Sequence, residues 1–307
     1  MKVKSDFEKK LAEILGANNQ LASSQLAFLS DLTKKELASF RQAWTKTGKE
    51  RRRQIISHLT KFQLDDLRLN FTGVFLACLE DSHEDIRSQA IMVLGREEDG
   101  FVIPPLIRSL REDESEKVRA AAAIALGQFA LLAAVEKLPL AQGAEIYFNL
   151  LKAIDDETET EEVKRRCLEA IAPLDSPRVK ELIEQGYHSD NIKVKASALC
   201  AMGRNCDSVW LPIIIKEKDN NEPEIRYEVA EACGELCMEE AIPTLIELAG
   251  DGDARVREAS IRALHQINGP RGKEALRQLL DSPYHDVGEA AKEVLDELEI
   301  FAGLFDL

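Results

Sequence analysis

One helical pattern recurs seven times along this chain of 307 residues, and it constrains the fold more than any other feature. Its clearest copy is Glu116 to Gly127, which reads Glu-Lys-Val-Arg-Ala-Ala-Ala-Ala-Ile-Ala-Leu-Gly. A Val or Ile is usually followed by Arg or Lys, by a small residue at +4, by apolar residues at +7 and +8, and often by Gly at +9. The copies begin at Ile86, Val118, Val163, Val194, Ile225, Val256 and Val287.

The spacing of these copies predicts the architecture. Successive starting positions are 32, 45, 31, 31, 31 and 31 residues apart. A fixed period of this length is the signature of helical hairpins that stack on one another, each burying the apolar face of the next. The sequence therefore predicts an all-α fold, a right-handed α-solenoid (α-α superhelix).

Three regions depart from the regular array of residues 71–307. Residues 1–70 form helices by their apolar period but lack the pattern, so we expect an N-terminal helical cap, because terminal repeats usually diverge. The long spacing after Val118 indicates an insertion near residues 129–143, which either packs on its own repeat or projects to shape a binding surface. The apolar end, residues 297–307, either caps the last repeat or docks elsewhere.

The turn inside each hairpin carries a second pattern. Asp81, Asp113 and Asp251 each stand six residues before an arginine, and those arginines are Arg87, Arg119 and Arg257. With the period, this spacing resembles HEAT repeats, specifically the PBS-lyase HEAT-like type of uncharacterised bacterial proteins. The resemblance implies HEAT-like helical hairpins and a structural ladder of Asp–Arg hydrogen bonds between neighbouring repeats. Thr158, Asn220 and Ser282 occupy the Asp position in other repeats, so we expect ladder contacts to be missing there.

The outward face of the patterned helix is the candidate binding surface. At 100° per residue, positions 0, +4, +7 and +8 face the core, whereas +2 and +6 face away from it. In HEAT-like solenoids these second helices line the concave side, so small and apolar residues there predict a site for a partner protein or peptide. The alternative is that the insertion or the cap covers them. The predicted partner-binding residues are Ser88, Met92, Ala120, Ile124, Ala196 and Tyr227.

Charge and hydropathy narrow the classes of partner. The net charge is −15, but residues 1–70 carry 14 Lys/Arg against 8 Asp/Glu. An acidic array disfavours nucleic acid, whose binding rests on neutralising phosphates. The basic run Arg51 to Arg53 is either a solvated helix face or a contact for an acidic partner or nucleic acid. We find no apolar run of membrane-spanning length and no secretory signal at the start, and so expect a cytoplasmic protein that does not enter a membrane.

No catalytic constellation, cofactor motif or metal site is evident. The five histidines are scattered, and His83-Glu84 alone has the His-Glu form that deoxyhypusine hydroxylases repeat to hold iron. Cys233 and Cys237 lack further ligands nearby, and we expect Cys78, Cys167 and Cys233 to be buried free thiols. We therefore predict a non-catalytic scaffold for protein–protein interaction. The alternatives are a subunit like a chromophore (bilin) lyase and, less favoured by charge, a HEAT-like nucleic-acid-binding protein.

Overall fold

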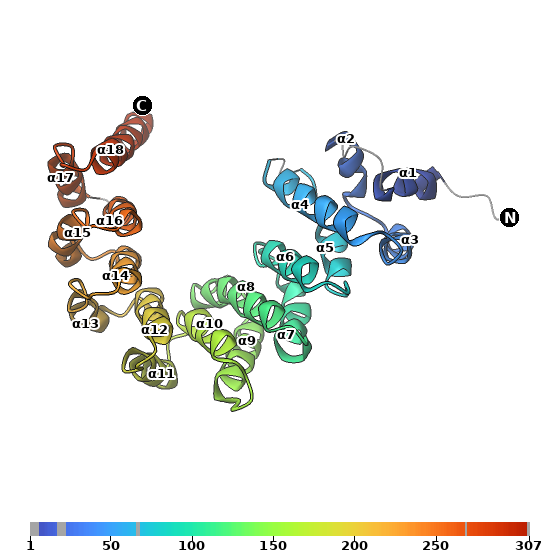
Figure 1. The fold of residues 1–307 in the computed structure, drawn as a ribbon, viewed down its shortest axis with the longest axis horizontal. Coiled ribbons are helices and arrows are strands. Elements are labelled where there is room, and N and C mark those ends of the chain that lie inside the picture. Colours follow the sequence, from blue (N-terminus) through green and yellow to red (C-terminus); the bar gives the residue numbers. More distant parts are fainter. Residues whose placement is uncertain (1–5, 17–22, 66–67, 268, 306–307) are drawn as a thin grey trace. The chain divides into compact units, whose positions relative to one another are not determined.

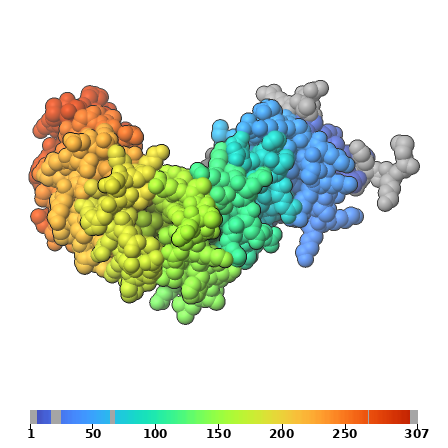
Figure 2. Space-filling view, turned by 60° about the horizontal axis from the view of Figure 1, so that its bottom comes forward, coloured from blue at the N-terminus to red at the C-terminus, as the bar shows by residue number. Residues whose placement is uncertain are grey.

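The computed structural model describes residues 6–16, 23–65, 68–267 and 269–305, in which helices, turns and loops occur without any β-strand. The predicted all-α solenoid of stacked helical hairpins is confirmed (Figure 1). The chain divides into two compact units, Met1–Cys167 and Leu168–Leu307. In each unit the repeats pack against one another in chain order (Figure 2).

The first unit begins with helices that lack the repeated pattern and continues with patterned hairpins. Its helices are α1 (Asp6–Leu15), α2 (Ser23–Leu26), η1 (Ala27–Leu29), α3 (Lys34–Trp44), α4 (Lys49–Asp65), α5 (Thr72–Cys78), α6 (Glu84–Leu94), η2 (Gly100–Val102), α7 (Ile103–Glu112), α8 (Glu116–Ala134) and α9 (Leu140–Asp155).

The second unit is a more regular array. Helix α10 (Glu161–Ile171) spans the division between the units. The remaining helices of the second unit are α11 (Pro177–Tyr187), α12 (Ile192–Asn205), η3 (Ser208–Trp210), α13 (Leu211–Ile215), α14 (Pro223–Leu236), η4 (Glu239–Ala241), α15 (Ile242–Leu248), α16 (Ala254–Ile267), α17 (Pro270–Leu279) and α18 (His285–Phe305).

Prolines set the start of the first helix in several hairpins. Helices α7, α13 and α15 each carry Pro in the first turn and follow a short 3-10 helix. Proline fits there because its missing N–H would have had no partner within the helix. The carboxylates of Asp99 and Asp207 accept backbone N–H groups at the start of η2 and η3. The chain therefore turns into α7 and α13 in the same way.

The glycine at +9 explains how closely the second helices pack. A Cβ at Gly95 would lie 2.8 Å from the Ala125 Cβ, and one at Gly203 would lie 2.7 Å from the Ala232 Cα. Gly234 stands in the same relation to Ala263. The +9 Gly of one repeat thus lies against the +7 Ala of the next, so the pattern encodes a contact between repeats. We call the second helices α4, α6, α8, α10, α12, α14, α16 and α18 the second-helix row.

The insertion is shared between two helices. Helix α8 continues to Ala134, the chain turns through Glu136 at φ 58°, and α9 begins at Leu140. Phe129 is buried, whereas Leu140 is 90% exposed. Helix α8 is the one helix in the described part of the chain long and apolar enough to cross a membrane. Ten of its residues are nevertheless buried, and it packs on α6, α7 and α9.

Candidate partner-binding surface

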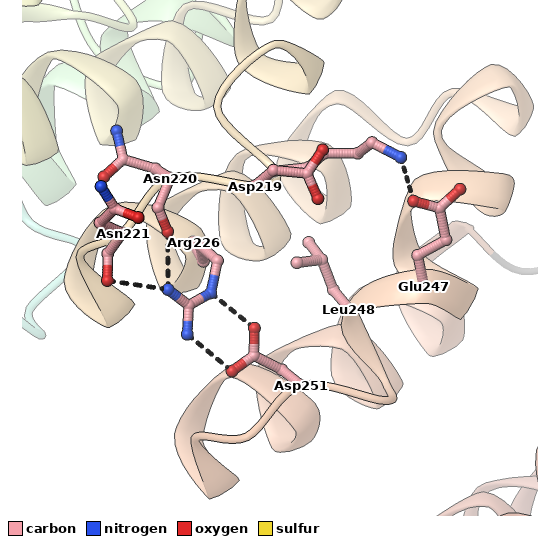
Figure 3. Close-up of a pocket in the computed structure, with 8 residues that line it drawn as sticks. Asp219, Asn220, Asn221, Arg226, Glu247, Leu248 and Asp251 are labelled. Atoms are coloured by element: carbon pink, nitrogen blue, oxygen red, sulfur yellow. Dashed lines mark hydrogen bonds and ion pairs between the residues drawn. The ribbon is translucent and has the colours of Figure 1, made fainter.

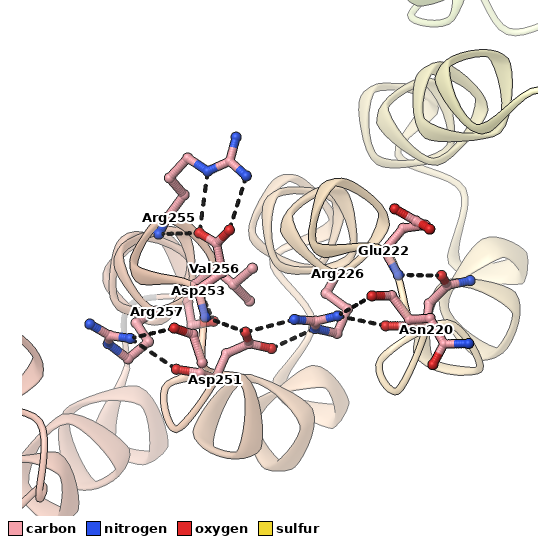
Figure 4. Close-up of polar contacts among 11 residues, drawn as sticks. Asn220, Glu222, Arg226, Asp251, Asp253, Arg255, Val256 and Arg257 are labelled. Atoms are coloured by element: carbon pink, nitrogen blue, oxygen red, sulfur yellow. Dashed lines mark hydrogen bonds and ion pairs between the residues drawn. The ribbon is translucent and has the colours of Figure 1, made fainter.

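The turns of the hairpins are joined by arginines, most clearly in the second unit (Figure 4). Arg226 donates to both carboxylate oxygens of Asp251, from Nε at 2.6 Å and Nη2 at 2.9 Å, and Nη1 donates to the Asn220 carbonyl at 2.7 Å. Asp251 also accepts the Asp253 N–H at 2.8 Å. Each arginine therefore ties the backbone of its own turn to the carboxylate of the next.

The first unit repeats this arrangement. Arg87 donates twice to Asp113, both at 2.8 Å, and to the Asp81 carbonyl at 2.7 Å. Arg119 donates to the Asp113 carbonyl and to both oxygens of Glu159, each at 2.8 Å. Hydrogen bonds to the neighbouring carboxylate are the largest cause that raises the pKa of both arginines. The guanidinium groups of Arg87 and Arg119 are therefore already paired inside the protein.

Our expectation that ladder contacts are missing at Thr158, Asn220 and Ser282 is wrong, because nearby acids supply them. Glu159 takes the contact next to Thr158. Lys195 pairs at 2.9 Å with Glu217, three residues before Asn220, and Arg257 pairs at 2.5 Å with Asp286, four residues after Ser282. Arg and Lys side chains are long enough to reach these acids, so the pairing survives the loss of Asp from its usual position.

A hollow of about 340 Å³ lies beside the ladder in the second unit (Figure 3). Most of its charged groups already have partners. Arg226 holds Asp251, and Lys218 pairs with Glu247. The hollow therefore offers little unsatisfied charge to a ligand.

The basic run of α4, Arg51 to Arg53, forms contacts with neighbouring parts of the chain. Arg51 donates to the Ile14 carbonyl of α1, from Nη2 at 2.7 Å and Nε at 3.0 Å. Arg52 donates to Asp81 at 2.6 Å, and Arg53 pairs with Asp85. The expectation of a solvated face is wrong for Arg51 and Arg52, which are buried, whereas Arg53 keeps 42% of its side chain exposed.

The predicted partner-binding residues differ in exposure. Ser88, Ala120 and Ala196 are buried, Ile124 and Tyr227 are half-buried, and Met92 is 43% exposed. Small residues at outward positions are covered because neighbouring second helices pack so closely. Direct contact with a partner would therefore fall to Met92, Ile124 and Tyr227.

An exposed apolar surface lies on the second-helix row of the first unit. Residues 124, 128 and 131 of α8 recur at spacings of four and three, so they share one helix face, and Val135 follows directly after the end of the helix. Leu131 and Val135 are 48% and 53% exposed. The ion pair between Asp85 of α6 and Lys117 of α8, at 2.6 Å, places the equivalent positions of the two helices side by side. We call Met92, Ile124, Leu131 and Val135 the apolar strip.

The second-helix row of the second unit is acidic instead. Glu169 is buried and accepts the Ser197 hydroxyl at 2.5 Å, and Arg204 donates to its carbonyl at 3.3 Å. Glu228 of α14 is half-buried nearby. Burial, followed by the carboxylates of Glu169 and Glu231, raises the pKa of Glu228 from 4.5 to about 8, against the opposing charge of Arg204. Glu228 is therefore largely protonated at neutral pH.

This raised pKa makes stability depend on pH in a definite direction. Between pH 4.5 and about 8 the folded protein holds a proton on Glu228 that the unfolded chain releases, so the free energy of unfolding falls as pH rises through this window. We expect Glu228→Gln to remove that fall and to stabilise the protein by about 1–2 kcal/mol at pH 8. Denaturant unfolding of the wild type and the variant at pH 5 and pH 8 measures this difference in the free energy of unfolding. An equal effect of the substitution at both pH values would contradict the assignment.

The described cysteines and histidines do not form a metal site. Cys78, Cys167 and Cys233 are buried free thiols, as predicted. Among the described residues, no group of three or more His, Cys, Asp or Glu side chains could hold a metal ion. Cys237 donates to the Gly234 carbonyl at 3.0 Å and ends α14 in the left-handed conformation.

Two known proteins are similar to this chain, one in sequence and one in structure. Deoxyhypusine hydroxylase of Candida albicans is 24% identical over 240 residues, which cover 61% of this chain and 76% of that protein. The complex of CpcE and CpcF of phycocyanin lyase from Nostoc sp. PCC7120 contains a chain with a TM-score of 0.55 at 17% identity. That match covers 92% of this chain and 97% of the other, and at such low identity it shows likeness of fold alone.

The repeats themselves match a known family. Residues 73–144 and 208–296, together just over half of the chain, match HEAT repeats. These ranges contain eleven of the twelve residues in the predicted Asp–Arg ladder and partner-binding sets, and Ala196 lies outside them. The chain belongs to the HEAT-repeat family.

Proposed function

We propose that this protein is a non-catalytic scaffold that binds a partner protein or peptide on its second-helix row, in the cytoplasm. The observation that carries the proposal is the apolar strip. The arginines of the ladder are engaged between repeats, whereas Met92, Leu131 and Val135 remain 43–53% exposed on one surface. Exposed apolar side chains gathered in this way are typical of interaction sites.

The strip suits a helical partner. Side chains on α8 at spacings of three and four residues, beside Met92 on α6, present a row that an amphipathic helix can cover with its own apolar face. Such a helix would remove the exposed parts of four apolar side chains from water, at roughly 25 cal/mol for each Å² buried. Contacts from several repeats would then add to the affinity.

We expect the double substitution Met92→Asp/Ile124→Asp to abolish binding of the physiological partner without unfolding the protein. Two carboxylates in the centre of the strip would have to be desolvated on binding, which is costly without paired charges. The measurement is a comparison of partners captured from native lysate by wild type and variant, with circular dichroism as a check of folding. Phe101→Asp is the matched control, because Phe101 is 51% exposed in the same unit but lies in η2, away from the row. Identical partners for wild type and the double variant would overturn the proposal.

The enzymatic alternative has its own discriminating result. Likeness to a phycocyanin lyase complex suggests a bilin as the ligand to try first. Under our proposal, mixing purified protein with a bilin leaves the absorbance spectrum of the pigment unchanged. A bilin spectrum shifted in proportion to the protein would favour the lyase-like function instead.

A further inference from the structure

We propose that Met92 is a modification site, at which oxidation of the thioether to the sulfoxide by hydrogen peroxide releases the partner from the apolar strip. This inference rests on the proposed function and adds how that site is regulated. It is drawn from the place of Met92 in the strip and from the burial of the other sulfur-containing side chains.

Met92 lies in the middle of the surface that a partner helix would cover. It belongs to α6 and is 43% exposed. Almost one turn later in α6, a Cβ at Gly95 would lie 2.8 Å from the Ala125 Cβ of α8, so the two helices are in close contact at this level. Ile124 precedes Ala125 and is half-buried. The Met92 side chain therefore lies on the same surface as Ile124 and is open to solvent.

Met92 is the exposed methionine in the part of the chain that the structure describes. Met202 of α12 is fully buried, and Met238, which precedes η4, is half-buried. Peroxide has to reach the sulfur atom in order to oxidise it, so exposure ranks these three sites. We therefore expect Met92 to be oxidised first among them.

The exposed cysteines compete poorly for peroxide. Cys206 and Cys237 directly follow α12 and α14, and both residues are exposed. Partial burial of the sulfur is nevertheless the largest cause that raises the pKa of each thiol, and the Glu235 carboxylate raises both pKa values further. The thiolate is the reactive form of cysteine, and a raised pKa makes it scarce. A thioether has no proton to lose, so its oxidation does not depend on ionisation.

The oxidation needs peroxide as its one co-reactant. The lone pair of the Met92 sulfur attacks one oxygen of hydrogen peroxide, the O–O bond breaks, an S–O bond forms and water leaves. Sulfur loses two electrons and the peroxide gains them. A methionine sulfoxide reductase reverses the step with a dithiol, which becomes a disulfide while the oxygen leaves as water. A partner helix that covers the sulfoxide with apolar side chains must remove water from its oxygen, so it binds less tightly.

The probe is a helical peptide with leucines at i, i+3, i+4 and i+7 and with uncharged polar residues elsewhere. Fluorescence anisotropy measures its affinity, and peptide mapping by mass spectrometry measures sulfoxide at each methionine after treatment with hydrogen peroxide. We expect sulfoxide to form at Met92 at least tenfold faster than at Met202. We expect the peptide to bind at least tenfold less tightly once Met92 is oxidised. The affinity should return after treatment with methionine sulfoxide reductase and a dithiol.

Two variants assign the effect, and each is compared with itself before and after peroxide, so that a change in its starting affinity does not matter. Met92→Leu has an apolar side chain without sulfur, and peroxide should leave its affinity unchanged. Met238→Leu is the matched control and should lose affinity as wild type does. A loss of affinity that persists in Met92→Leu, or wild type that keeps its affinity with Met92 fully oxidised, would overturn the inference and leave the strip as the binding site. If Met92→Asp/Ile124→Asp binds the peptide as tightly as wild type, or unoxidised wild type does not bind it, the proposed function fails as well.

Discussion

Asp81→Ala is expected to lower the free energy of unfolding of the first unit by about 3–5 kcal/mol, the usual cost of breaking a buried ion pair from one side. The Asp81 side chain is fully buried and accepts from Trp44 Nε1 and from Arg52 Nη1, both at 2.6 Å. It also accepts the His83 N–H at 2.9 Å. Without the carboxylate, Arg52 would stay buried with only a long contact to Ser82 Oγ at 3.4 Å.

Denaturant unfolding measures the change in the free energy of unfolding. Hydrogen exchange of the backbone amides in α4 and α6 then assigns the loss to the first unit. Asp286→Ala is the matched control, because Asp286 accepts from Arg257 in the same ladder but keeps half of its side chain exposed. Exposed ion pairs contribute little, so we expect a loss below about 1 kcal/mol. Similar losses for the two variants would show that burial does not set the strength of these contacts.

Gly203→Ala is expected to destabilise the second unit by about 1–3 kcal/mol, the usual cost of adding a methyl group to a filled interior. The new Cβ would lie 2.7 Å from the Ala232 Cα and 3.2 Å from the Glu235 Cβ. Because the nearest atom belongs to the backbone, α12 and α14 would have to move apart. This loss of stability is opposite to the usual effect, since Gly→Ala within an exposed helix ordinarily stabilises by about 1 kcal/mol.

Gly73→Ala provides the comparison, measured by thermal and denaturant unfolding alongside Gly203→Ala. Gly73 lies in α5, and a Cβ there would meet Leu37 at 3.8 Å, an ordinary contact. We expect this variant to be neutral or slightly more stable than wild type. A stabilising Gly203→Ala would mean that the close approach of α12 and α14 is not required for packing.

Local patterns in the sequence predicted the hairpins because each repeat satisfies most of its needs within itself or with the next. Helices α7, α13 and α15, for example, each carry Pro in the first turn, a local signal for a helix start. The reason for the recurrent glycine at +9, by contrast, lies in a neighbouring helix and cannot be seen in the repeat itself. Contacts between repeats also bury Ser88, Ala120 and Ala196, which helical periodicity alone placed on an outward face.

The repeated pattern does not show that α4 belongs to the second-helix row, and the physical reason is similar. Arg52 holds the ladder position, and Ile55 and Leu59 follow it on the buried face. The preceding position, where other copies have Val or Ile, is Arg51, whose guanidinium instead donates to the Ile14 carbonyl of α1. Only that distant contact explains the substitution, so the pattern alone could not identify α4 as a member of the row. Likewise, the raised pKa of Glu228 depends first on burial and then on the carboxylate of Glu169 in α10.

The place of Arg52 in the ladder has a practical consequence for dissecting the protein. A shortened chain that began at residue 71 would include every copy of the repeated pattern and look complete by alignment of repeats. It would nevertheless separate Asp81 from Arg52 and Trp44, and Phe71 from the stacked ring of Phe62 at 6.3 Å. Truncations meant to keep these contacts should therefore retain α3 with its capping box at Thr33, and also α1, whose Ile14 carbonyl accepts from Arg51.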